Sequence, residues 1–390
     1  MIAAGIGALS CLIWLVLLVA RGGFWRILTL PAGLKLEAAA PPRVAVVVPA
    51  RNEADLIGAV VRSLLEQDYP GPLRIFVVDD HSTDDTRGAV AAAANQNGDR
   101  LTMLSSAALP AEWTGKMWAL AQGVERAAEF SPDYFLFTDA DIVHTPGSLT
   151  SLVAMAQTRN LDLVSMMVKL KCESLAERAL IPAFVFFFFM LYPPRWVNDR
   201  REKTAAAAGG DILVRADALH NAGGIAAIRN ELIDDCALAR AIKRNGAIWL
   251  GLTNDARSIR SYDGFGGIGS MISRNAFYQL RHSVWLLLGT LLGLAITYLA
   301  PPVVIFFGGW AALWGGLAWL MMSVSFWPMV RFYGLSPMWT VSLPLVALFY
   351  AGATVHSAVQ YWMGRGGEWK GRAQDTRSEA DHLPVRGDGN

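Results

Sequence analysis

The chain has 390 residues, of which 53% are hydrophobic and 17% are charged. This hydrophobic share is high for a wholly soluble protein, and the formal net charge of +1 argues against a nucleic-acid partner, which usually requires a strongly basic face. Cys11, Cys172 and Cys236 show no disulfide or metal-ligand spacing, which is consistent with a reducing compartment.

The first apolar stretch, "IAAGIGALSCLIWLVLLVA" at residues 2–20, is long enough to cross a bilayer. No basic residue precedes it and no clear cleavage site of small residues follows, which favours a retained anchor over a signal peptide. Arg21, Arg26 and Lys35 come after it, so the positive-inside rule places the following segment in the cytoplasm. We therefore expect a transmembrane anchor at residues 1–22.

Residues 41–283 have the mixed composition of one sizeable α/β domain. "RVAVVVPARNEAD" at 43–55 begins as an apolar strand covered on both faces, and a helical pattern follows it. "LRIFVVDDHSTDDT" at 73–86 and "YFLFTDADI" at 134–142 repeat the strand with an acidic ending. Such units predict an α/β sheet whose site lies along the carboxyl ends of the strands.

A dinucleotide-binding oxidoreductase is the main alternative for such a domain. It would need a Gly-x-Gly-x-x-Gly turn after the first strand. Here that turn reads "PARNEAD" and contains no glycine, so the alternative loses its main support.

Asp139 and Asp141 follow the third predicted strand and are two residues apart. In extended backbone both carboxylates would project to the same side, and hard divalent cations prefer oxygen ligands, often carboxylates together with substrate phosphates. The pair thus suits a metal-diphosphate site, although aspartates also end strands because they favour turns. His144 could add a ligand, but a surface or turn histidine is the favoured interpretation.

Three further groups of residues fit a binding or catalytic role and also fit a purely structural one. Asp79 and Asp80 could accept hydrogen bonds from a nucleobase or ribose; we also expect Ser82, Thr83 and Asp84 to form a turn and helix cap here, and both interpretations can hold together. Lys116 could meet a diphosphate, or be a surface lysine. Asp234 and Asp235 begin a predicted helix, where the helix dipole favours acids, but one of them could also serve as a general base for an incoming hydroxyl.

Residues 179–194, "ALIPAFVFFFFMLYPP", are uncharged and contain five phenylalanines. The stretch is short for a spanning helix and Pro182 interrupts it. Two interpretations stay open: a buried core helix, or a segment at the membrane interface that presents a lipid acceptor to the site.

Residues 284–364 form the second apolar region, with no Asp, Glu, Lys or Arg from 284 to 330. We expect two to three spans, with breaks at "APP" near 300 and "GG" near 308, followed by a polar tail at 365–390. Three spans would put the tail outside, yet "GRGGEWKGR" is basic and favours the cytoplasm. Either one apolar segment is re-entrant or the tail is periplasmic.

Six segments in this order resemble family 2 glycosyltransferases with the GT-A fold, a Rossmann-like nucleotide-sugar-binding domain. They are "VVVPARNEAD", "VVDDHSTDDT", "GKMWALAQG", "FTDADIVH", "AAGGDILVRADALHNAGG" and "IDDCALARAIKRNG", and they span about residues 43–250. "RGGFW", "CESLAERALIPAFVFFFFMLYPPRWVND" and "GTLLGLAITYLAPP" look more particularly like the hopanoid-associated (HpnB-type) glycosyltransferases of bacteria.

The resemblance implies roles for individual residues. Asp139 and Asp141 would bind Mg²⁺ or Mn²⁺, and Asp235, preceded by Asp234, would be the catalytic base in a motif that is usually Glu-Asp. The residues implied to bind the nucleotide sugar are Pro49, Arg51, Glu53, Asp79, Asp80, Lys116 and Asp139. Those implied on the acceptor side are Gly209, Gly210, Asp211, Gln279 and Arg281.

The implied activity is inverting transfer from a nucleotide sugar, first of all a UDP-sugar, to a hydroxyl or phosphate of a hopanoid or polyprenyl-type lipid. The enzyme would be a multi-pass protein of the bacterial inner membrane with a cytoplasmic catalytic domain. Processive members usually carry Gln-x-x-Arg-Trp, whereas "YQLRHSVW" spaces Gln279 and Arg281 differently, which favours a single transfer. A processive polysaccharide synthase and a catalytically silent membrane scaffold are the alternatives, and a transporter is disfavoured because the spans lack ionisable residues.

Overall fold

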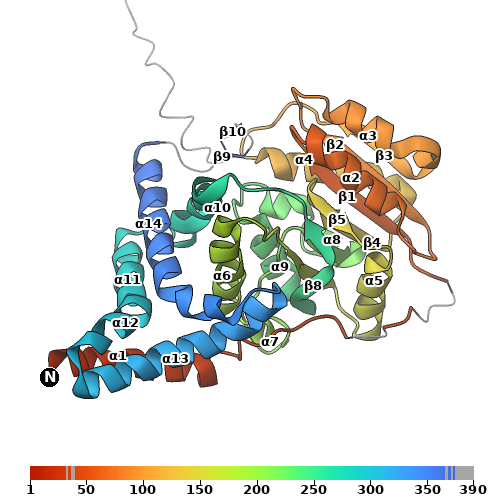
Figure 1. Cartoon of the computed structure of the whole chain (residues 1–390). Coiled ribbons are helices and arrows are strands. Elements are labelled where there is room, and N and C mark those ends of the chain that lie inside the picture. Colours follow the sequence, from red (N-terminus) through yellow and green to blue (C-terminus); the bar gives the residue numbers. More distant parts are fainter. Residues whose placement is uncertain (32–33, 37–39, 365–367, 370–371, 374–390) are drawn as a thin grey trace, which may run out of the picture.

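A mixed sheet of eight strands, in the order β3-β2-β1-β4-β7-β6-β8-β5, lies at the centre of the α/β domain (Figure 1). The computed structural model describes residues 1–31, 34–36, 40–364, 368–369 and 372–373. The strands are β1 (Val44–Ala50), β2 (Leu73–Asp79), β3 (Leu101–Ser105), β4 (Tyr134–Thr138), β5 (Ile142–His144), β6 (Leu163–Lys169), β7 (Asp211–Arg215) and β8 (Ile248–Ser258). The predicted α/β sheet is confirmed.

The strands β3, β2, β1 and β4 are parallel neighbours, which brings their carboxyl ends to one edge of the sheet. Ala50, for example, lies opposite Asp79. β7 runs antiparallel between β4 and β6, and β8 pairs in parallel with β6 and antiparallel with β5. β7 therefore begins at this edge, where Asp211 lies opposite Thr138 at the end of β4, and β6 and β8 run in the same direction as β4.

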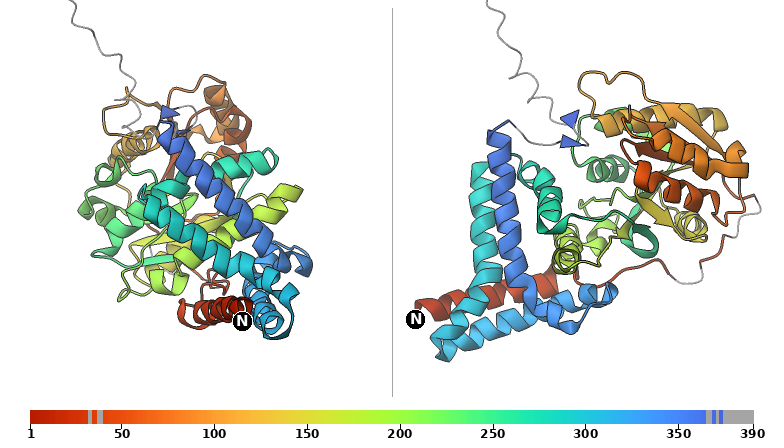
Figure 2. Two further views of the ribbon diagram at one scale, coloured as in Figure 1. Left: turned by 90° about the vertical axis from the view of Figure 1, so that its left-hand side faces the viewer. Right: turned by 45° about the horizontal axis from the view of Figure 1, so that its top comes forward.

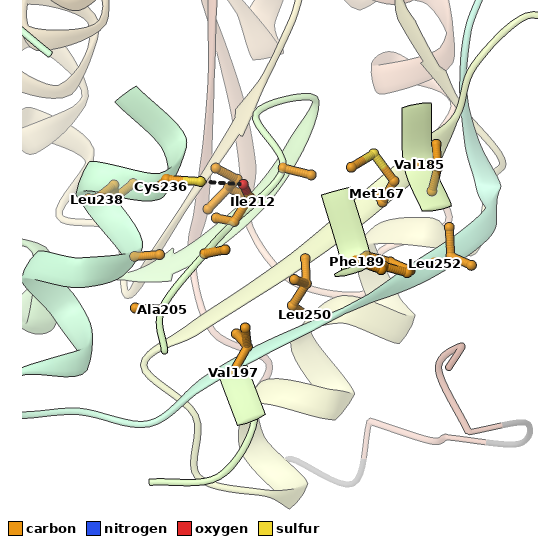
Figure 3. Close-up of a cluster of buried hydrophobic side chains, with 14 of the residues drawn as sticks. Met167, Val185, Phe189, Val197, Ala205, Ile212, Cys236, Leu238, Leu250 and Leu252 are labelled. Carbon is orange, nitrogen blue, oxygen red and sulfur yellow. Dashed lines mark hydrogen bonds between the residues drawn. The ribbon is translucent and has the colours of Figure 1, made fainter. Parts of the chain in front are cut away.

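Helices cover both faces of the sheet, and β1 is therefore buried along its whole length. The helices α2 (Ala54–Leu65), α3 (Thr86–Ala94) and α5 (Ser148–Thr158) pack on one face. On the other lie α4 (Gly115–Ala127), α6 (Leu175–Leu191), α8 (Ala216–Asn221) and α9 (Asp234–Lys243). Figure 3 shows part of the second core, where Val185 and Phe189 of α6 lie near Met167 and Leu252 of the sheet.

The uncharged stretch at 179–194 lies mostly in α6, which begins with a capping box between Ser174 and Glu177. Pro182 is inside the helix, where its ring removes one backbone donor without ending the helix. Phe186 and Phe189 are fully buried, and Tyr350 donates a hydrogen bond to the Leu180 carbonyl (3.3 Å). This burial favours the core-helix interpretation, with α6 placed between the sheet and the apolar helices.

Among the described residues, four helical stretches are long and apolar enough to span a membrane: Ile2–Ala20, Val284–Phe307, Gly309–Phe332 and Pro337–Trp362. The first is α1 and the third α13; the second joins α11 (Val284–Leu294), a π-helical turn (Ala295–Leu299), α12 (Ala300–Val304) and a 3-10 turn (Ile305–Phe307). The fourth joins a 3-10 segment (Pro337–Ser342) to α14 (Leu343–Trp362).

The predicted break at "APP" near residue 300 is wrong. Pro301 lies in the first turn of α12, where a missing backbone donor is tolerated, and the π-helical turn before it continues the helix. The break at "GG" is confirmed: Gly308 and Gly309 have φ values of +68° and +50°, which favour glycine.

The apolar helices pack in two groups (Figure 2). α1 lies along α13, and Trp14 donates a hydrogen bond to the Thr297 carbonyl (2.8 Å). α14 lies along α10 (Gly264–Gln279), the helix that follows the last strand of the large sheet. At the end of α14 the Tyr361 ring stacks on His282, with centroids 3.8 Å apart, so the last apolar helix ends where the first C-terminal one begins.

Candidate active site

A hollow of about 330 Å³ lies at the carboxyl ends of β1 and β4. It is hereafter called the cleft. Its polar lining consists of Lys116, Thr138, Asp139, Asp234 and Asp235, and the rest is Pro49, Met117, Leu120, Phe137, Gly209, Ile212, Ile228 and Leu238. Residues that the sequence placed in separate motifs therefore meet in one place, above an apolar floor.

Lys116 joins two of these motifs. Its Nζ lies 3.1 Å from Asp139 Oδ1 and 3.1 Å from Asp234 Oδ2. It stands in the first turn of α4, whose start is fixed because Thr114 accepts a hydrogen bond from the Met117 amide. Burial alone would lower the pKa of Lys116, but the surrounding carboxylates raise it above its ordinary value. Lys116 is therefore a fixed cation, and the alternative of a free surface lysine is wrong.

Asp235 lies beside this ion pair in the first turn of α9. Its Oδ1 accepts a hydrogen bond from the Cys236 amide (2.7 Å). Burial raises the pKa of Asp235 to about 7, and the charge of Asp234 acts in the same direction, while Lys116 opposes them. A carboxyl group with this pKa exchanges its proton near neutral pH, which is what general-base catalysis requires.

Gly209 leaves the space above these groups open. A Cβ atom at this position would lie 3.4 Å from Asp235 Oδ2 and 3.6 Å from Lys116 Nζ. Any longer side chain would enter the cleft. The absence of a side chain here therefore keeps the Asp235 carboxylate accessible.

The sequence predicted extended backbone for Asp139 and Asp141, and this prediction is wrong. β4 ends at Thr138, and the Ile142 amide donates to the Asp139 carbonyl (3.2 Å), which closes a turn. Asp139 points to Lys116, whereas Asp141 Oδ2 accepts from Ser258 Oγ (2.7 Å) and Arg260 Nε (3.2 Å). The two carboxylates therefore have different partners on the two sides of the turn.

The donor set around this turn fits a divalent cation. Within the described residues no three His, Cys, Asp or Glu side chains form a complete metal site, so phosphate or water oxygens would have to complete the coordination. Among the described residues, five carboxylates, those of Glu53, Asp139, Asp141, Asp234 and Asp235, share the two cations Lys116 and Arg260. When all five are ionised, they exceed these two cations by three negative charges, of which one Mg²⁺ or Mn²⁺ would neutralise two.

His144 is neither a surface residue nor a turn residue. It ends β5 inside the protein, where Nε2 lies 3.0 Å from Thr138 Oγ1 and Nδ1 lies 3.5 Å from Ser148 Oγ. Burial lowers its pKa to about 4. His144 is therefore a neutral core residue under the turn, and its ring nitrogens are engaged by hydroxyl groups.

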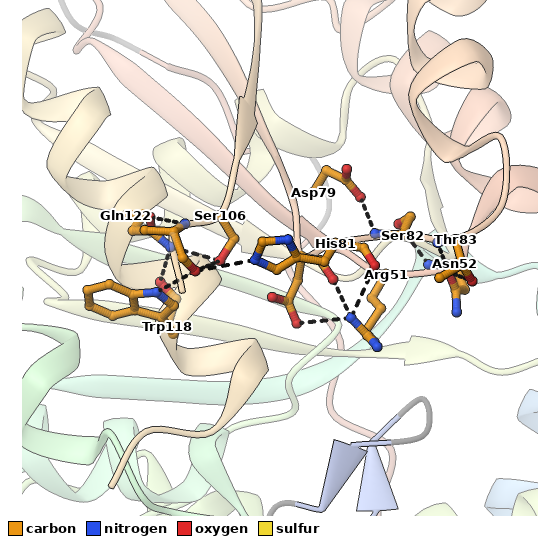
Figure 4. A network of polar contacts seen from close by, with 11 residues as sticks. Arg51, Asn52, Asp79, His81, Ser82, Thr83, Ser106, Trp118 and Gln122 are labelled. Atoms are coloured by element: carbon orange, nitrogen blue, oxygen red, sulfur yellow. Dashed lines mark hydrogen bonds and ion pairs between the residues drawn. The ribbon is translucent and has the colours of Figure 1, made fainter. Parts of the chain in front are cut away.

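The residues predicted for nucleotide recognition lie where β1 and β2 end (Figure 4). Asp80 is fully buried, and Arg51 Nη1 lies 3.9 Å from its carboxylate and donates to its carbonyl. Asp79 Oδ1 accepts from the Ser82 amide (3.1 Å). The turn-and-cap interpretation therefore holds for this loop, and the carboxylates stand at the edge of the sheet that also carries the cleft.

Arg260 was not found from the sequence. Its Nη2 lies 2.6 Å from Glu53 Oε1, while its Nε contacts Asp141. Burial alone would lower the pKa of this guanidinium, but the two carboxylates raise it. No motif marks an arginine two residues after a strand, and only the pairing of β5 with β8 brings it to the turn.

The predicted acceptor-side residues separate into four places. Gly209 lines the cleft. Gln279 donates to the Tyr192 hydroxyl (2.7 Å), which joins the end of α10 to the end of α6. Arg281 is exposed in the turn between α10 and α11.

Gly210 and Asp211 turn into the interior. Gly210 packs near Val168, and Asp211 begins β7, where alternation sends its side chain to the face opposite Ile212 of the cleft. Asp211 is 1% exposed, and neither carboxyl oxygen has a hydrogen-bond partner among the described residues. Burial raises its pKa to about 8. Asp211 is thus a neutral buried acid below the cleft.

Both the sequence and the fold of the chain resemble those of known proteins. The sequence profile described as "Glycosyltransferase like family 2" matches residues 41–250. No curated protein sequence matches the chain. The mannosyltransferase PcManGT from Pyrobaculum calidifontis, solved in complex with GDP-Man and Mn²⁺, has a TM-score of 0.59 at 20% identity and covers 91% of this chain and 98% of its own. Glucosyl-3-phosphoglycerate synthase from Mycobacterium tuberculosis, solved with Mg²⁺ and uridine-diphosphate, has a TM-score of 0.39 at 21% identity, covering 59% and 75%.

Proposed function

The chain belongs to family 2 of the glycosyltransferases, and from this premise we propose that it transfers one sugar from a nucleotide-sugar donor to a lipid hydroxyl with inversion at the anomeric carbon. One observation carries the proposal: Lys116 holds Asp139 and Asp234 together beside Asp235. This arrangement places a fixed cation, Lys116, and a basic carboxylate, Asp235, in the lining of the same cleft.

In the proposed reaction the acceptor oxygen attacks the anomeric carbon while Asp235 takes the hydroxyl proton. The bond from that carbon to the diphosphate oxygen breaks at the same time, and the nucleoside diphosphate leaves. The raised pKa of Asp235 suits it to this proton transfer, and Lys116 stabilises the negative charge that develops on the leaving diphosphate.

A Mg²⁺ or Mn²⁺ ion held by Asp139 and Asp141 would supply further positive charge to the diphosphate. The excess of carboxylates over cations around the turn supports this assignment, and PcManGT, which shares the fold, was solved with GDP-Man and Mn²⁺. Asp79, Asp80 and Arg51 at the ends of β1 and β2 would hold the nucleoside. A UDP-sugar remains our prediction for the donor.

The charges of the cleft favour a hydroxyl over a phosphate as the acceptor. A phosphate would add negative charge next to Asp139, Asp234 and Asp235, where Lys116 is already paired with two of these and a bound metal ion would be engaged by the donor diphosphate. At an effective dielectric constant of 20, each pair of like charges 6 Å apart costs about 3 kcal/mol. A neutral alcohol avoids this repulsion and uses the base.

The lipid nature of the acceptor is supported by the apolar helices beside the cleft. α6 packs against α10, α13 and α14, and Gln279 at the end of α10 donates to the Tyr192 hydroxyl at the end of α6 (2.7 Å). A lipid bound along these helices would keep its chain among apolar residues while its head group enters the cleft. A hopanoid alcohol is the acceptor we propose, on the strength of the sequence resemblance.

We further propose that α1, the α11–α12 segment and α13 cross the bacterial inner membrane, with the α/β domain at 41–283 in the cytoplasm. The fourth segment would be re-entrant. It follows Tyr333, whose ring lies 6.0 Å from the Lys169 ammonium at the end of β6, and it turns back along α13, where Trp319 donates to the Val341 carbonyl (3.2 Å). It ends at His282, so both of its ends lie beside the α/β domain.

The decisive experiment is release of nucleoside diphosphate by the reconstituted full-length protein. A panel of nucleotide sugars is offered with bacterial lipid extract, with Mn²⁺ or Mg²⁺ and again with chelator, beside an Asp139→Ala/Asp141→Ala variant. Release that needs metal and lipid and disappears in the variant supports the proposal, with one sugar per acceptor. Folded protein that neither binds nor turns over any donor would make it a silent scaffold.

A further inference from the structure

The Asp141 carboxylate is fixed by two neighbours on the strand β8 and its continuation. Ser258 Oγ donates to Asp141 Oδ2 (2.7 Å), and Arg260 Nε donates to the same oxygen (3.2 Å). The Ile259 amide also donates to the Asp141 carbonyl (2.9 Å). Three consecutive residues therefore hold both the backbone and the side chain of Asp141.

The second side of Arg260 is held by a buried acid. Its Nη2 lies 2.6 Å from Glu53 Oε1, and the Glu53 side chain is only 8% exposed. A charged hydrogen bond in such surroundings is strong and directional. Glu53 stands at the start of α2, so the guanidinium is clamped between the turn after β4 and the turn after β1.

The segment that follows Arg260 is anchored as well. The Tyr262 amide donates to Glu177 Oε1 (3.3 Å), and the same carboxylate closes the capping box of α6. Arg260 is therefore not a mobile surface side chain. It is held in place on both sides along the chain and at both ends of its guanidinium group.

We propose that Arg260, together with Ser258, is a positioning residue that turns Asp141 so that its Oδ1 faces the divalent cation. The inference rests on the proposed function. Within the part of the chain that the structure describes, both of these side-chain contacts use Oδ2, so Oδ1 would be the oxygen that binds the metal. Outer partners of metal ligands commonly fix the ligand's orientation, and their loss typically costs 10- to 100-fold in metal affinity.

The test is Mn²⁺ binding to the full-length protein in detergent, measured without donor by the electron paramagnetic resonance signal of free Mn²⁺. We expect Arg260→Gln and Ser258→Ala each to weaken binding about tenfold, and Arg260→Lys to lie between Arg260→Gln and the natural protein. Arg257→Gln removes the same charge from an exposed position on β8 and should leave binding unchanged.

The sign of the effect separates positioning from simple charge neutralisation. If Arg260 were only a counter-charge, Arg260→Gln would bind Mn²⁺ more tightly and Ser258→Ala would bind it unchanged; that pair of results overturns the proposal. Should Arg260→Gln fail to fold, the neutral Ser258→Ala variant decides alone. If Asp139→Asn/Asp141→Asn binds Mn²⁺ as well as the natural protein does, the metal assignment within the proposed function fails instead.

Discussion

Lys116 lies 3.1 Å from Asp139 and 3.1 Å from Asp234, so one ammonium group connects the turn after β4 with the start of α9. These two elements are 95 residues apart in the sequence. Placing a cation between them holds the two halves of the cleft together, and its two short contacts go to Asp139 and Asp234 rather than to Asp235, the next residue. The contact thus helps to fix the shape of the cleft and also contributes to its charge.

Replacing Lys116 with methionine should lower the turnover number about 100-fold, because a preorganised positive group at a developing charge typically contributes that much. The variant also loses the charge that lowers the pKa of Asp235, so the acidic limb of its pH profile should move to higher pH. Turnover is measured as nucleoside diphosphate release. Lys203→Met, at an exposed position, is the control; equal losses in both variants would contradict the assignment.

Asp235→Asn should abolish transfer while leaving donor binding close to that of the natural protein. Because the base must be deprotonated and its pKa is about 7, kcat/KM of the natural protein should rise with pH up to that point and then level off. Donor binding by calorimetry and a pH series of turnover check both statements. A rate that is flat from pH 5 to 8 would show that another group takes the proton.

Much of the α/β domain could be predicted from the sequence, because β1, β2 and β4 are apolar runs that end in acidic turns. Asp139 belongs to one of these turns, and Lys116 follows the parallel strand β3. Asp234 and Asp235 begin α9, after the antiparallel strand β7, so their place in the cleft depends on the tertiary fold. The partners of Asp141 could not be predicted, since Ser258 reaches it only through antiparallel pairing with Ile142, which depends on the whole sheet.

Two other predictions from the sequence were wrong, and the three-dimensional structure explains both. His144 is polar, yet the hydroxyls of Thr138 and Ser148 satisfy it in the core, which a single sequence does not reveal. The "APP" motif was expected to end a helix, but Pro301 falls in the first turn of α12. A proline's effect depends on its place within the helix, and the hydropathy pattern alone does not give that place.

Asp211→Asn should stabilise the protein, and more so at higher pH. The folded state raises the Asp211 pKa from 3.8 to about 8, so below pH 4 the acid is neutral in both states and costs nothing by linkage. As pH rises toward 8, the unfolded chain gains its charge and the folded one does not, which destabilises the folded state by on the order of 5 kcal/mol. Thermal unfolding at pH 5 and pH 8 should therefore show a larger gain in stability for the variant at pH 8.

Asp217→Asn, at an exposed position of α8, is the control and should show no gain in stability. If the gain of Asp211→Asn is independent of pH, packing and not ionisation explains it.

The C-terminal tail should lie on the same side of the membrane as the α/β domain. Both ends of the fourth apolar segment lie beside this domain: the segment leaves α13 at Tyr333, beside Lys169 of β6, and it ends at Tyr361, which stacks on His282 just before α11. A segment that enters and leaves beside the same domain does not change sides. A fluorescent protein that folds only in the cytoplasm should therefore fluoresce when fused after Gly364, whereas alkaline phosphatase fused there should be inactive. Fusion after Gly308, at the other end of the α11–α12 segment, should give the opposite pair of results. Active phosphatase at both positions would mean that Pro337–Trp362 crosses the bilayer completely.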